Sequence, residues 1–561
     1  MAGRWPKWRP VTFPVFMTQL PTEFPDFGLT PEQRREAVRG HYYERPGMDG
    51  ERGEIWCYSN RFSYRAGETV TLHVSSTAPR FSIVIVRDGG SETKVFEQTG
   101  LSARWQDTPD QCSVEGCGWE ASFEFRISDD WPSGAYRLTL TADGREPIHC
   151  HHLIIVAPLP GRKPGRVLQV AATGTWLSYN TWGGSNAYQG ITGPGRDQYA
   201  RMVSTQRPWC RGFVVLPKDA PRVPLEVAVP PKTVPRYPHM EWAYATGHSK
   251  KYTSSGWASY DSHFFRFAER AGYGVDLASQ HDLHFSPEIL DGYDCVVFVG
   301  HDEYWTWEMR DGVDSYVERG GHAARFAGNF MWQTRLEDEG RRQVCYKYRA
   351  RAEDPAYFRG GDVTRATNSW EAPEIGRPGA MTFGLNATRG VYAGWGGCAP
   401  RGVRGFPVYR PEHWAFAGTG MYYGDLLGAD SHVYGYEVDG LDFEIRGGLP
   451  YPTPDSGAPD GLQVLAVGMA SQVEESADIP IEDQFLTDED GRFTAETLFG
   501  EATDANLEKV KRGNGMIVNF PRGKGEVFHA GSCEWVAGLL RQDPMVERVT
   551  RNVIDRYLGK S

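Results

Sequence analysis

The chain has 561 residues, and its 72 acidic and 60 basic side chains give a formal net charge of −12. This length predicts two or three domains. The negative charge disfavours nucleic acid as a partner, because binding phosphates requires a basic surface. No apolar run is long enough to span a bilayer, and the N-terminus lacks the apolar stretch of a signal peptide. We therefore expect a cytoplasmic protein with no membrane partner.

The first part of the chain predicts a short extension followed by β-structure. Residues 1–50 contain one helical pattern, which starts at Pro31 after the N-cap candidate Thr30. Residues 51–158 hold strand-like stretches such as "TVTLHVSS" and "FSIVIVRD", with glycine-containing turns beside them. We interpret this region as an immunoglobulin-like β-sandwich. "IHCHH" at 148–152 is interpreted as a strand and not a metal site, because alternation sends neighbouring side chains to opposite faces.

Residues 166–561 alternate apolar strands with amphipathic helices. "RVLQVAA", "DCVVFVG" and "HAARFAG" are strand-like, whereas "DSHFFRFAERAGY" and "EMRDGVDSYVERG" have helical spacing. This alternation predicts an α/β domain with a doubly wound parallel sheet. A glycine-rich, aromatic insertion around 335–510 has weak periodicity and is expected to cap that sheet.

One stretch concentrates polar chemistry at the end of a predicted strand. In "VFVGHDEYWTWEMRD" (297–311), an apolar run ends at Gly300 and is followed by His301, Asp302, Glu303 and Tyr304. Ligands of open α/β sheets bind beyond the carboxyl ends of the strands. These side chains could bind a metal, move a proton, or form a polar cap on the strand. The residues alone leave the three roles open.

Several ordered stretches resemble one protein family. They include "WCYSNRFSYRAGETVTLHVS", "WLSYNTWGGSNAY", "GHDEYWTWEMRD", "VYGYEVDG" and "FHAGSCEW". From about residue 53 to its end, the chain resembles the large (beta) subunit of N,N-dimethylformamidase and its relatives. The resemblance implies an immunoglobulin-like domain followed by a glutamine-amidotransferase-like α/β domain. It also implies a mononuclear Fe(III) centre held by two tyrosines and one glutamate.

Matching the motifs assigns these ligands to Tyr304 of "GHDEYW", Tyr346 of "VCYK" and Glu437 of "GYEVDG". Oxygen donors suit a hard cation. The metal would polarise an amide carbonyl and activate water, so the implied activity is hydrolysis of a small formamide-like or N-substituted amide. The alternatives that stay open are Tyr348 and Tyr357 for the second tyrosine, and Glu444 for the glutamate.

Other residues are candidates for supporting roles, with a purely structural role equally open for each. His301 could orient water, Asn329 could donate to an oxyanion, and His432 could act as a general base. The candidate substrate-binding residues are Asn180, Trp182, Trp305 and Trp332. The resemblance also suggests a homo-oligomer. A small helical subunit accompanies such relatives, but this shorter chain need not have one.

Two other functions compete with the iron enzyme. One is a cysteine-dependent amidohydrolase or amidotransferase on the same fold, with Cys295, Cys345 or Cys533 as nucleophile. The other is a non-catalytic binding protein whose sandwich recognises a partner. The nine cysteines are an odd number in a large chain, so a disulfide framework is not expected.

Overall fold

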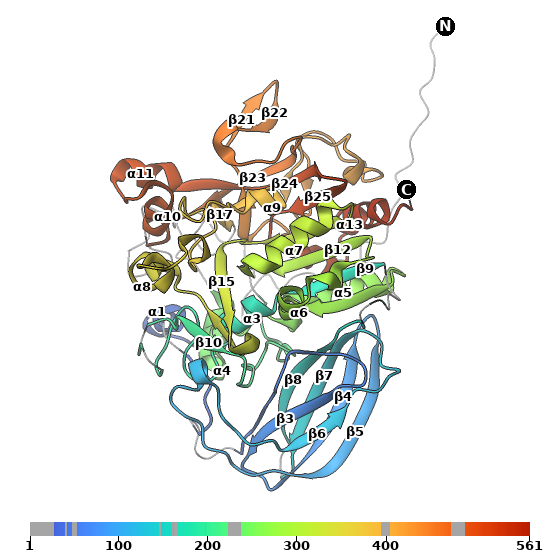
Figure 1. Cartoon of the computed structure of the whole chain (residues 1–561), viewed down its shortest axis with the longest axis vertical. Helices are drawn as coiled ribbons and strands as arrows, with labels where there is room; N and C mark the ends of the chain where they lie inside the picture. The colour runs from blue at the N-terminus through green and yellow to red at the C-terminus, as the bar shows by residue number, and fades with distance from the viewer. Residues whose placement is uncertain are drawn as a thin grey trace.

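The computed structural model describes residues 27–39, 42–47, 53–144, 147–159, 161, 166–193, 195–196, 198–222, 237–393, 404–472 and 489–560. Much of the predicted extension 1–50 and part of the insertion 335–510 lie outside the described residues. A β-structure occupies one end of the molecule and a mixed α/β structure the other (Figure 1). None of the helices in the described ranges combines the length and apolar character needed to cross a membrane.

The N-terminal β-structure consists of two packed sheets. One has the order β1 (Ile55–Ser59), β3 (Thr69–Ser76), β6 (Phe123–Arg126). The other has the order β2 (Ser63–Tyr64), β8 (Ile148–Val156), β7 (Gly134–Ala142), β4 (Arg80–Asp88), β5 (Glu92–Ser102). Alternating apolar residues of β3 and β4 point into the shared core. Two packed sheets are therefore confirmed, "IHCHH" is part of β8, and the immunoglobulin-like assignment stays a prediction.

The central sheet has nine strands, of which five are parallel. These are β11 (Val275–Ser279), β9 (Val167–Ala171), β12 (Cys295–His301), β14 (His322–Gly328) and β25 (Gly525–Ala530), in that spatial order. Numbered along the chain, the order is second, first, third, fourth, fifth, which is a doubly wound arrangement. The antiparallel strands β24 (Arg512–Arg522), β23 (Gln463–Ser471), β17 (Asn386–Ala393) and β20 (Tyr436–Gly440) extend it.

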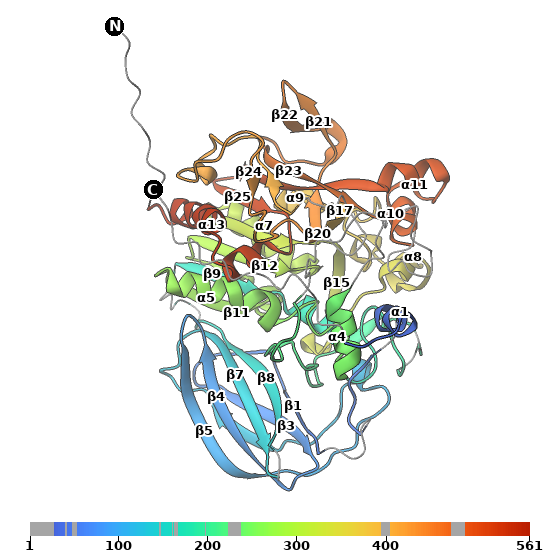
Figure 2. The same ribbon diagram turned by 180° about the vertical axis from the view of Figure 1, so that it is seen from behind.

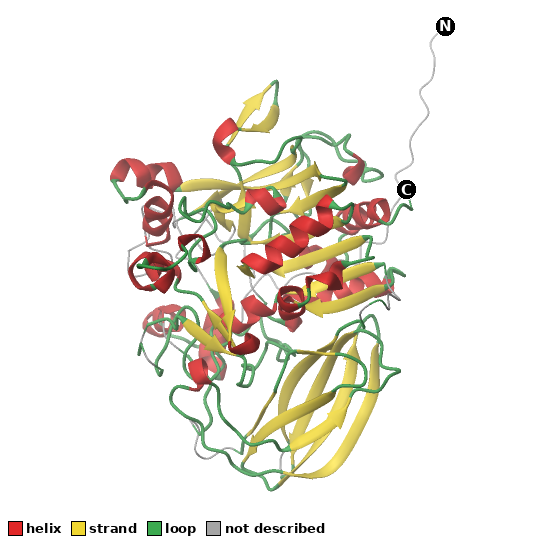
Figure 3. Cartoon of the chain, viewed as in Figure 1, coloured by secondary structure: helices red, strands yellow, loops and turns green. Residues whose placement is uncertain are grey.

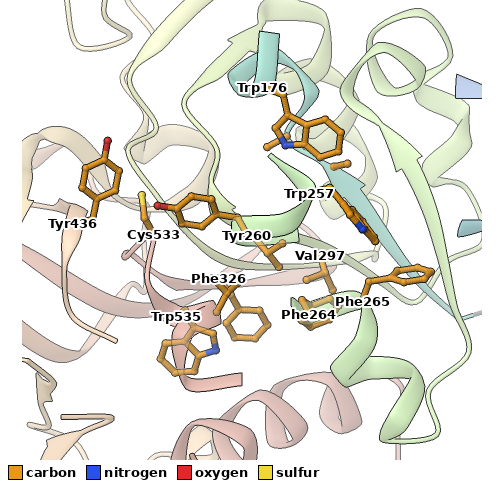
Figure 4. Close-up of a cluster of buried hydrophobic side chains, with 14 of the residues drawn as sticks. Trp176, Trp257, Tyr260, Phe264, Phe265, Val297, Phe326, Tyr436, Cys533 and Trp535 are labelled. Carbon is orange, nitrogen blue, oxygen red and sulfur yellow. The ribbon is translucent and has the colours of Figure 1, made fainter. Parts of the chain in front are cut away.

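Helices cover both faces of the sheet (Figures 2 and 3). One face carries α5 (Ser262–Arg270), α12 (Trp535–Leu540) and α13 (Pro544–Tyr557), and the other carries α6 (Gln280–Phe285) and α7 (Trp307–Glu318). Aromatic rings join the layers: Phe326 of β14 lies 6.2 Å from Phe264 and 5.4 Å from Trp535, measured between ring centroids (Figure 4). The amphipathic spacing of α5 thus explains its packing.

The sandwich is fixed to the α/β part by an ion pair between a buried carboxylate and a partly exposed guanidinium. The carboxylate of Asp88, at the end of β4, accepts bonds of 2.6 and 2.9 Å from the guanidinium of Arg266 on α5. Its other oxygen accepts a 2.9 Å bond from the indole N–H of Trp257. Because Asp88 is fully buried, these bonds compensate the loss of its hydration.

Smaller elements surround the carboxyl ends of the parallel strands. A four-stranded sheet has the order β10 (Met202–Ser204), β16 (Arg342–Val344), β15 (Trp332–Glu337), β13 (Tyr304–Thr306). Helix α10 (Glu489–Phe499) lies beside α8 (Ala350–Glu353) (Figure 1). The remaining helices and hairpin strands include α1 (Pro31–Arg39), α3 (Thr173–Tyr179), α4 (Pro238–Thr246), α9 (Ala380–Phe383), α11 (Asp504–Val510), β21 (Phe443–Arg446) and β22 (Leu449–Pro452).

Candidate metal centre and active site

Two glycines bring the functional strands together. Gly300 has φ +73°, and a Cβ there would lie 2.6 Å from the Cβ of Tyr260. Gly328 ends β14, and a Cβ there would lie 2.6 Å from the backbone oxygen of Glu437. Larger residues would separate β12 and β14 from their neighbours. The glycines therefore allow His301, Asn329 and Glu437 to meet.

His301 connects two glutamates. Its Nε2 lies 2.7 Å from a carboxylate oxygen of Glu437 and 3.3 Å from one of Glu303. Its Nδ1 lies 2.7 Å from the backbone oxygen of Ser254, so Nδ1–H donates there. Burial alone would lower the pKa of His301, but Glu437 and Glu303 outweigh it and raise the pKa to about 10. The imidazole is therefore a cation at neutral pH.

The side-chain oxygens of Tyr188, Tyr304 and Glu303, which could bind a metal, lie beside the His301–Glu437 pair. The phenol of Tyr188 donates to Glu303, with distances of 2.7 and 2.8 Å to the two carboxylate oxygens. The phenol of Tyr304 donates to the Tyr188 oxygen at 2.9 Å. The indole N–H of Trp332 donates to Glu303 at 2.6 Å. His301 ends β12 and Glu303 lies in the two-residue link before β13, and both side chains point toward the same place.

Burial and neighbouring charges together set the protonation states of Glu303, Tyr188 and Tyr304. Burial opposes ionisation of Glu303, but His301, Lys347 and the Tyr188 phenol outweigh it and lower the pKa of Glu303. Burial and the Glu303 charge raise the pKa of Tyr188 and Tyr304 well above 10, so both phenols keep their protons beside that carboxylate. A bound cation would invert this preference by stabilising the phenolates.

Asn329 completes the group. Its backbone has φ +63°, and the backbone N–H groups of Asn329 and Phe330 donate to Asp439 at 2.8 and 3.2 Å. Its Nδ2 donates to Glu437 at 2.9 Å. Its Oδ1 is buried and meets no hydrogen-bond donor among the described residues. Asp439 thus holds Asn329 in a conformation that few non-glycine residues adopt.

A cavity leads to part of this group, whereas His301 and Tyr304 line neither of its chambers. An inner chamber of about 40 Å³ is lined by Glu303, Asn329, Trp332 and Glu437, among others. A larger outer chamber of about 630 Å³ shares Tyr188 and Glu437 with it. Asp490 and Phe493 of α10 line both chambers. The inner chamber therefore suits a reacting group, and the outer chamber suits the rest of a ligand.

A second group of possible metal ligands overlaps the first. One ligand atom each from His301, Glu437 and Cys533 lies within 4.8 Å of the others. However, Cys533 is fully buried, which raises the pKa of its thiol well above 9, and the nearby Glu437 raises it further. His301 is held as a cation by its neighbours. The phenol and carboxylate oxygens of Tyr188, Tyr304 and Glu303 are the better match to a hard cation.

The structure does not bring Tyr346 to this group. Its side chain is half-buried near Asp354 and Arg335, and it lines neither chamber. Tyr348, the alternative, lines both chambers. Tyr357 lies elsewhere and donates to Glu374 at 2.6 Å. The alternation of side chains near 346–348 could not be read from the sequence, because this segment is a short 3₁₀ turn and not a strand.

Among the predicted substrate-binding residues, one lines a chamber and others have structural roles elsewhere. Trp332 lines the inner chamber, as expected for a substrate contact. Asn180 instead holds a turn, because its Oδ1 accepts from the backbone of Trp182 and Cys210. Trp182 packs edge-on against Trp56 and Trp119.

Trp305 and His432 also lie away from the chambers. Trp305 is in the core beneath the sheet, with its indole N–H on Asp302. His432 lies beside Arg404, and burial together with Arg541 and Arg404 lowers its pKa to about 3. Neither residue lines a chamber. Glu444, the alternative to Glu437, is exposed on β21 and pairs with Arg446.

The cysteine alternative gains no support. Burial raises the pKa of Cys345 to about 12 and also raises the pKa of Cys295 and Cys533. Each thiol therefore stays protonated and a poor nucleophile. All eight cysteines in the described part of the chain are free and buried.

Several cavity residues were not predicted. Tyr188 is the last residue of the motif "WLSYNTWGGSNAY", but its contact with Glu303 spans 115 positions and leaves no local signal. Lys347 lies with its Nζ 3.1 Å from the centroid of the Tyr188 ring, and burial lowers its pKa to about 7. Lys251 and Asp490 line the outer chamber. Only the three-dimensional fold assembles these residues.

The fold and the site define an α/β protein that carries a β-sandwich and a buried phenol–carboxylate site at the carboxyl ends of its parallel strands. The family described as N,N-dimethylformamidase beta subunit-like, C-terminal, matches residues 86–547, and the chain belongs to this family. A relative is the N,N-dimethylformamidase beta subunit of Paracoccus aminophilus. It is 25% identical over 326 residues, which cover 53% of this chain and 36% of the relative. The match thus spans well under half of that relative's length.

Proposed function

We propose that this protein is an iron-dependent amidohydrolase, which uses water to cleave the C–N bond of an N-substituted amide. The observation that carries the proposal is the meeting of Tyr188, Tyr304 and Glu303 beside the His301–Glu437 pair. The family, and the name of the Paracoccus relative, support amide hydrolysis. The alternative nucleophiles are buried thiols, which do not favour a cysteine mechanism.

The spacing of the oxygen group supports the proposal of a single bound ferric ion. Metal–oxygen bonds of roughly 2.0–2.2 Å separate neighbouring ligand atoms by roughly 3 Å. The phenol oxygens lie 2.9 Å apart, and the Tyr188 oxygen lies 2.7 Å from Glu303. We therefore propose Tyr188, Tyr304 and Glu303 as ligands. This set keeps the expected two tyrosines and one glutamate, but Tyr188 replaces Tyr346 and Glu303 replaces Glu437.

The surrounding residues would carry out the proton transfers. When bound, iron would supply Lewis acidity that polarises the amide carbonyl and acidifies water. The Glu437 carboxylate, which already accepts hydrogen bonds from His301 and Asn329, would accept the proton of the attacking water. The Nδ2 group of Asn329 would then donate to the carbonyl oxygen as it gains charge. The C–O bond forms, the C–N bond breaks, and the proton on Glu437 passes to the amine nitrogen.

Metal analysis combined with amine release tests this function. The purified protein is expected to contain near-stoichiometric iron and to release amine from N,N-dimethylformamide or from larger N-substituted amides. Removal of the iron should abolish release, and restored iron should return it. Undiminished release by iron-free protein would remove iron from the proposal. No release from any amide by iron-loaded protein would contradict hydrolysis.

We also propose that the chain works as an oligomer, since the Paracoccus relative is named as a subunit. Light scattering of the purified chain should give a mass above that of one copy. If the chain is a monomer and still hydrolyses amides, the oligomer proposal is wrong and the hydrolase proposal stands.

A further inference from the structure

The outer chamber contains a lysine whose ammonium contacts aromatic rings but has no hydrogen-bond or ion-pair partner among the described residues. Lys251 is 7% exposed and lines the chamber. Its Nζ lies 5.0 Å from the centroid of the Tyr188 ring and 5.3 Å from that of Tyr179. Within the described ranges its Nζ donates no hydrogen bond and joins no ion pair, whereas its backbone N–H donates to the Ser249 hydroxyl. Burial lowers the pKa of Lys251, and the two ring faces compensate a buried ammonium only in part, so a ligand that supplies an anionic partner is favoured.

The nearby carboxylates are engaged elsewhere. Glu303 and Glu437 both contact His301. Asp490 accepts a hydrogen bond from Tyr392 at 3.3 Å. These three carboxylates act on Lys251 only at longer range. Lys251 therefore remains available to an anion that enters the chamber.

The neighbouring lysine gives a contrast. Lys250 also lines the chamber, but its Nζ donates to the backbone oxygens of Val38 and Arg39, each at 3.4 Å. Backbone oxygens thus accept hydrogen bonds from the Lys250 ammonium, whereas no such acceptor binds the Lys251 ammonium in the described part of the chain. Of the two lysines, Lys251 is therefore the better candidate for an anion contact, and the arginines of the same lining, Arg39 and Arg492, have interactions of their own.

The size and lining of the chamber describe the rest of the ligand. Its volume of about 630 Å³ falls within the roughly 300–1,000 Å³ typical of sites for drug-sized molecules. Tyr179, Tyr348, Tyr392 and Phe493 line it with aromatic rings. Such a chamber is larger than a one-carbon amide needs and favours an apolar or aromatic group.

We propose that Lys251 binds a carboxylate of the substrate, and that the substrate is a carboxylate-bearing amide with an apolar group, such as an N-acylated aromatic amino acid. This inference rests on the proposed amide hydrolysis. The reaction would be N-acyl amino acid plus water giving a carboxylic acid and a free amino acid. The carboxylate would lie close to the scissile bond, because Lys251 and Glu303 both approach Tyr188.

A matched pair of amides tests the inference. N-acetylphenylalanine carries the carboxylate, and N-(2-phenylethyl)acetamide lacks it but is otherwise similar. For each, binding is measured by calorimetry and kcat/KM by amine release. The wild-type protein is expected to prefer the charged amide at least tenfold in both measurements. Lys251→Met should reduce this preference ratio toward one, and Lys251→Arg should restore part of it.

Lys94→Met is the matched control, because Lys94 is an exposed lysine paired with Glu97 on the sandwich. It removes the same charge and should keep the preference ratio. Equal binding of the two amides by wild-type protein would overturn the inference, as would an equal loss for both amides in Lys251→Met. Lys251-dependent binding without hydrolysis would uphold the carboxylate contact and contradict the proposed function instead.

Discussion

His301 and Glu437 join the end of β12 to β20, with Nε2 and the carboxylate oxygen 2.7 Å apart. The pair is fixed from both sides, because His301 also donates to Ser254 and Glu437 accepts from Asn329. A carboxylate held in this way can accept and return a proton without moving. Glu303, one of the proposed oxygen ligands, lies 3.3 Å from the same Nε2 atom, so His301 would link the proton-transfer group to the proposed metal site.

The ligand set predicts which substitutions release iron. Glu303→Gln removes the carboxylate charge and should lose most of the bound iron together with amide hydrolysis. Tyr346→Phe should keep both, because the charged neighbours of Tyr346 include Asp354 and Arg335 but not Glu303. Iron content by atomic absorption distinguishes the variants. Loss of iron from Tyr346→Phe, with retention in Glu303→Gln, would restore the assignment made from the motifs.

Asn329→Ala removes the proposed oxyanion donor. Loss of one such donor lowers kcat by about 10²–10³-fold. Iron content should stay unchanged, because Asn329 donates to Glu437 and not to the three oxygen ligands. Asn506→Ala, on the remote helix α11, provides the same substitution as a control. A kcat in Asn329→Ala within twofold of wild type would exclude the oxyanion role.

Asp88→Ala tests the contact between the sandwich and the α/β part. It leaves the Arg266 guanidinium and the Trp257 indole N–H without their buried acceptor. Removing one partner of a buried pair costs about 3–5 kcal/mol of the free energy of unfolding. Asp129→Ala, which removes an exposed partner of Arg126, should cost less than about 1 kcal/mol. Urea unfolding followed by tryptophan fluorescence measures both values, and similar values would contradict the packing argument.

His152 predicts one part of the pH dependence. It is buried in β8, and burial lowers its pKa to about 3 from the ordinary 6.5. As the pH falls, His152 is protonated in the unfolded chain before it is protonated in the folded one. Its contribution to the free energy of unfolding is therefore fully present above pH 6.5 and is lost as the pH drops toward 3. At pH 4 the loss is on the order of 3 kcal/mol.

His152→Gln should therefore lose less stability than wild type between pH 7 and pH 4, as measured by urea unfolding at both values. His149→Gln changes an exposed histidine of the same strand and should retain the wild-type difference. An unchanged pH difference in His152→Gln would show that this histidine does not contribute to the acid sensitivity.

Much of the architecture was predictable from local pattern. The apolar run at 295–300 and the helical spacing at 262–270 became β12 and α5, because period and burial determine such elements. Glu303 and Tyr304 were visible as polar residues after a strand. Tyr188 and Lys251 were not, because their roles depend on contacts between distant segments. Asn180 and Trp182 lie in a conspicuous motif, yet their side chains serve a turn and a core.

Gly328 has a consequence for the order in which the site forms during synthesis. The segment from Tyr188 to Tyr304 supplies the proposed iron ligands, whereas Glu437 reaches His301 only after β20 has closed over Gly328. A nascent chain that ends shortly after β14 would therefore contain the metal-binding oxygens without the carboxylate that handles the proton. The ability to bind iron would precede the ability to cleave an amide, so an incomplete chain could be loaded with metal and yet remain inactive.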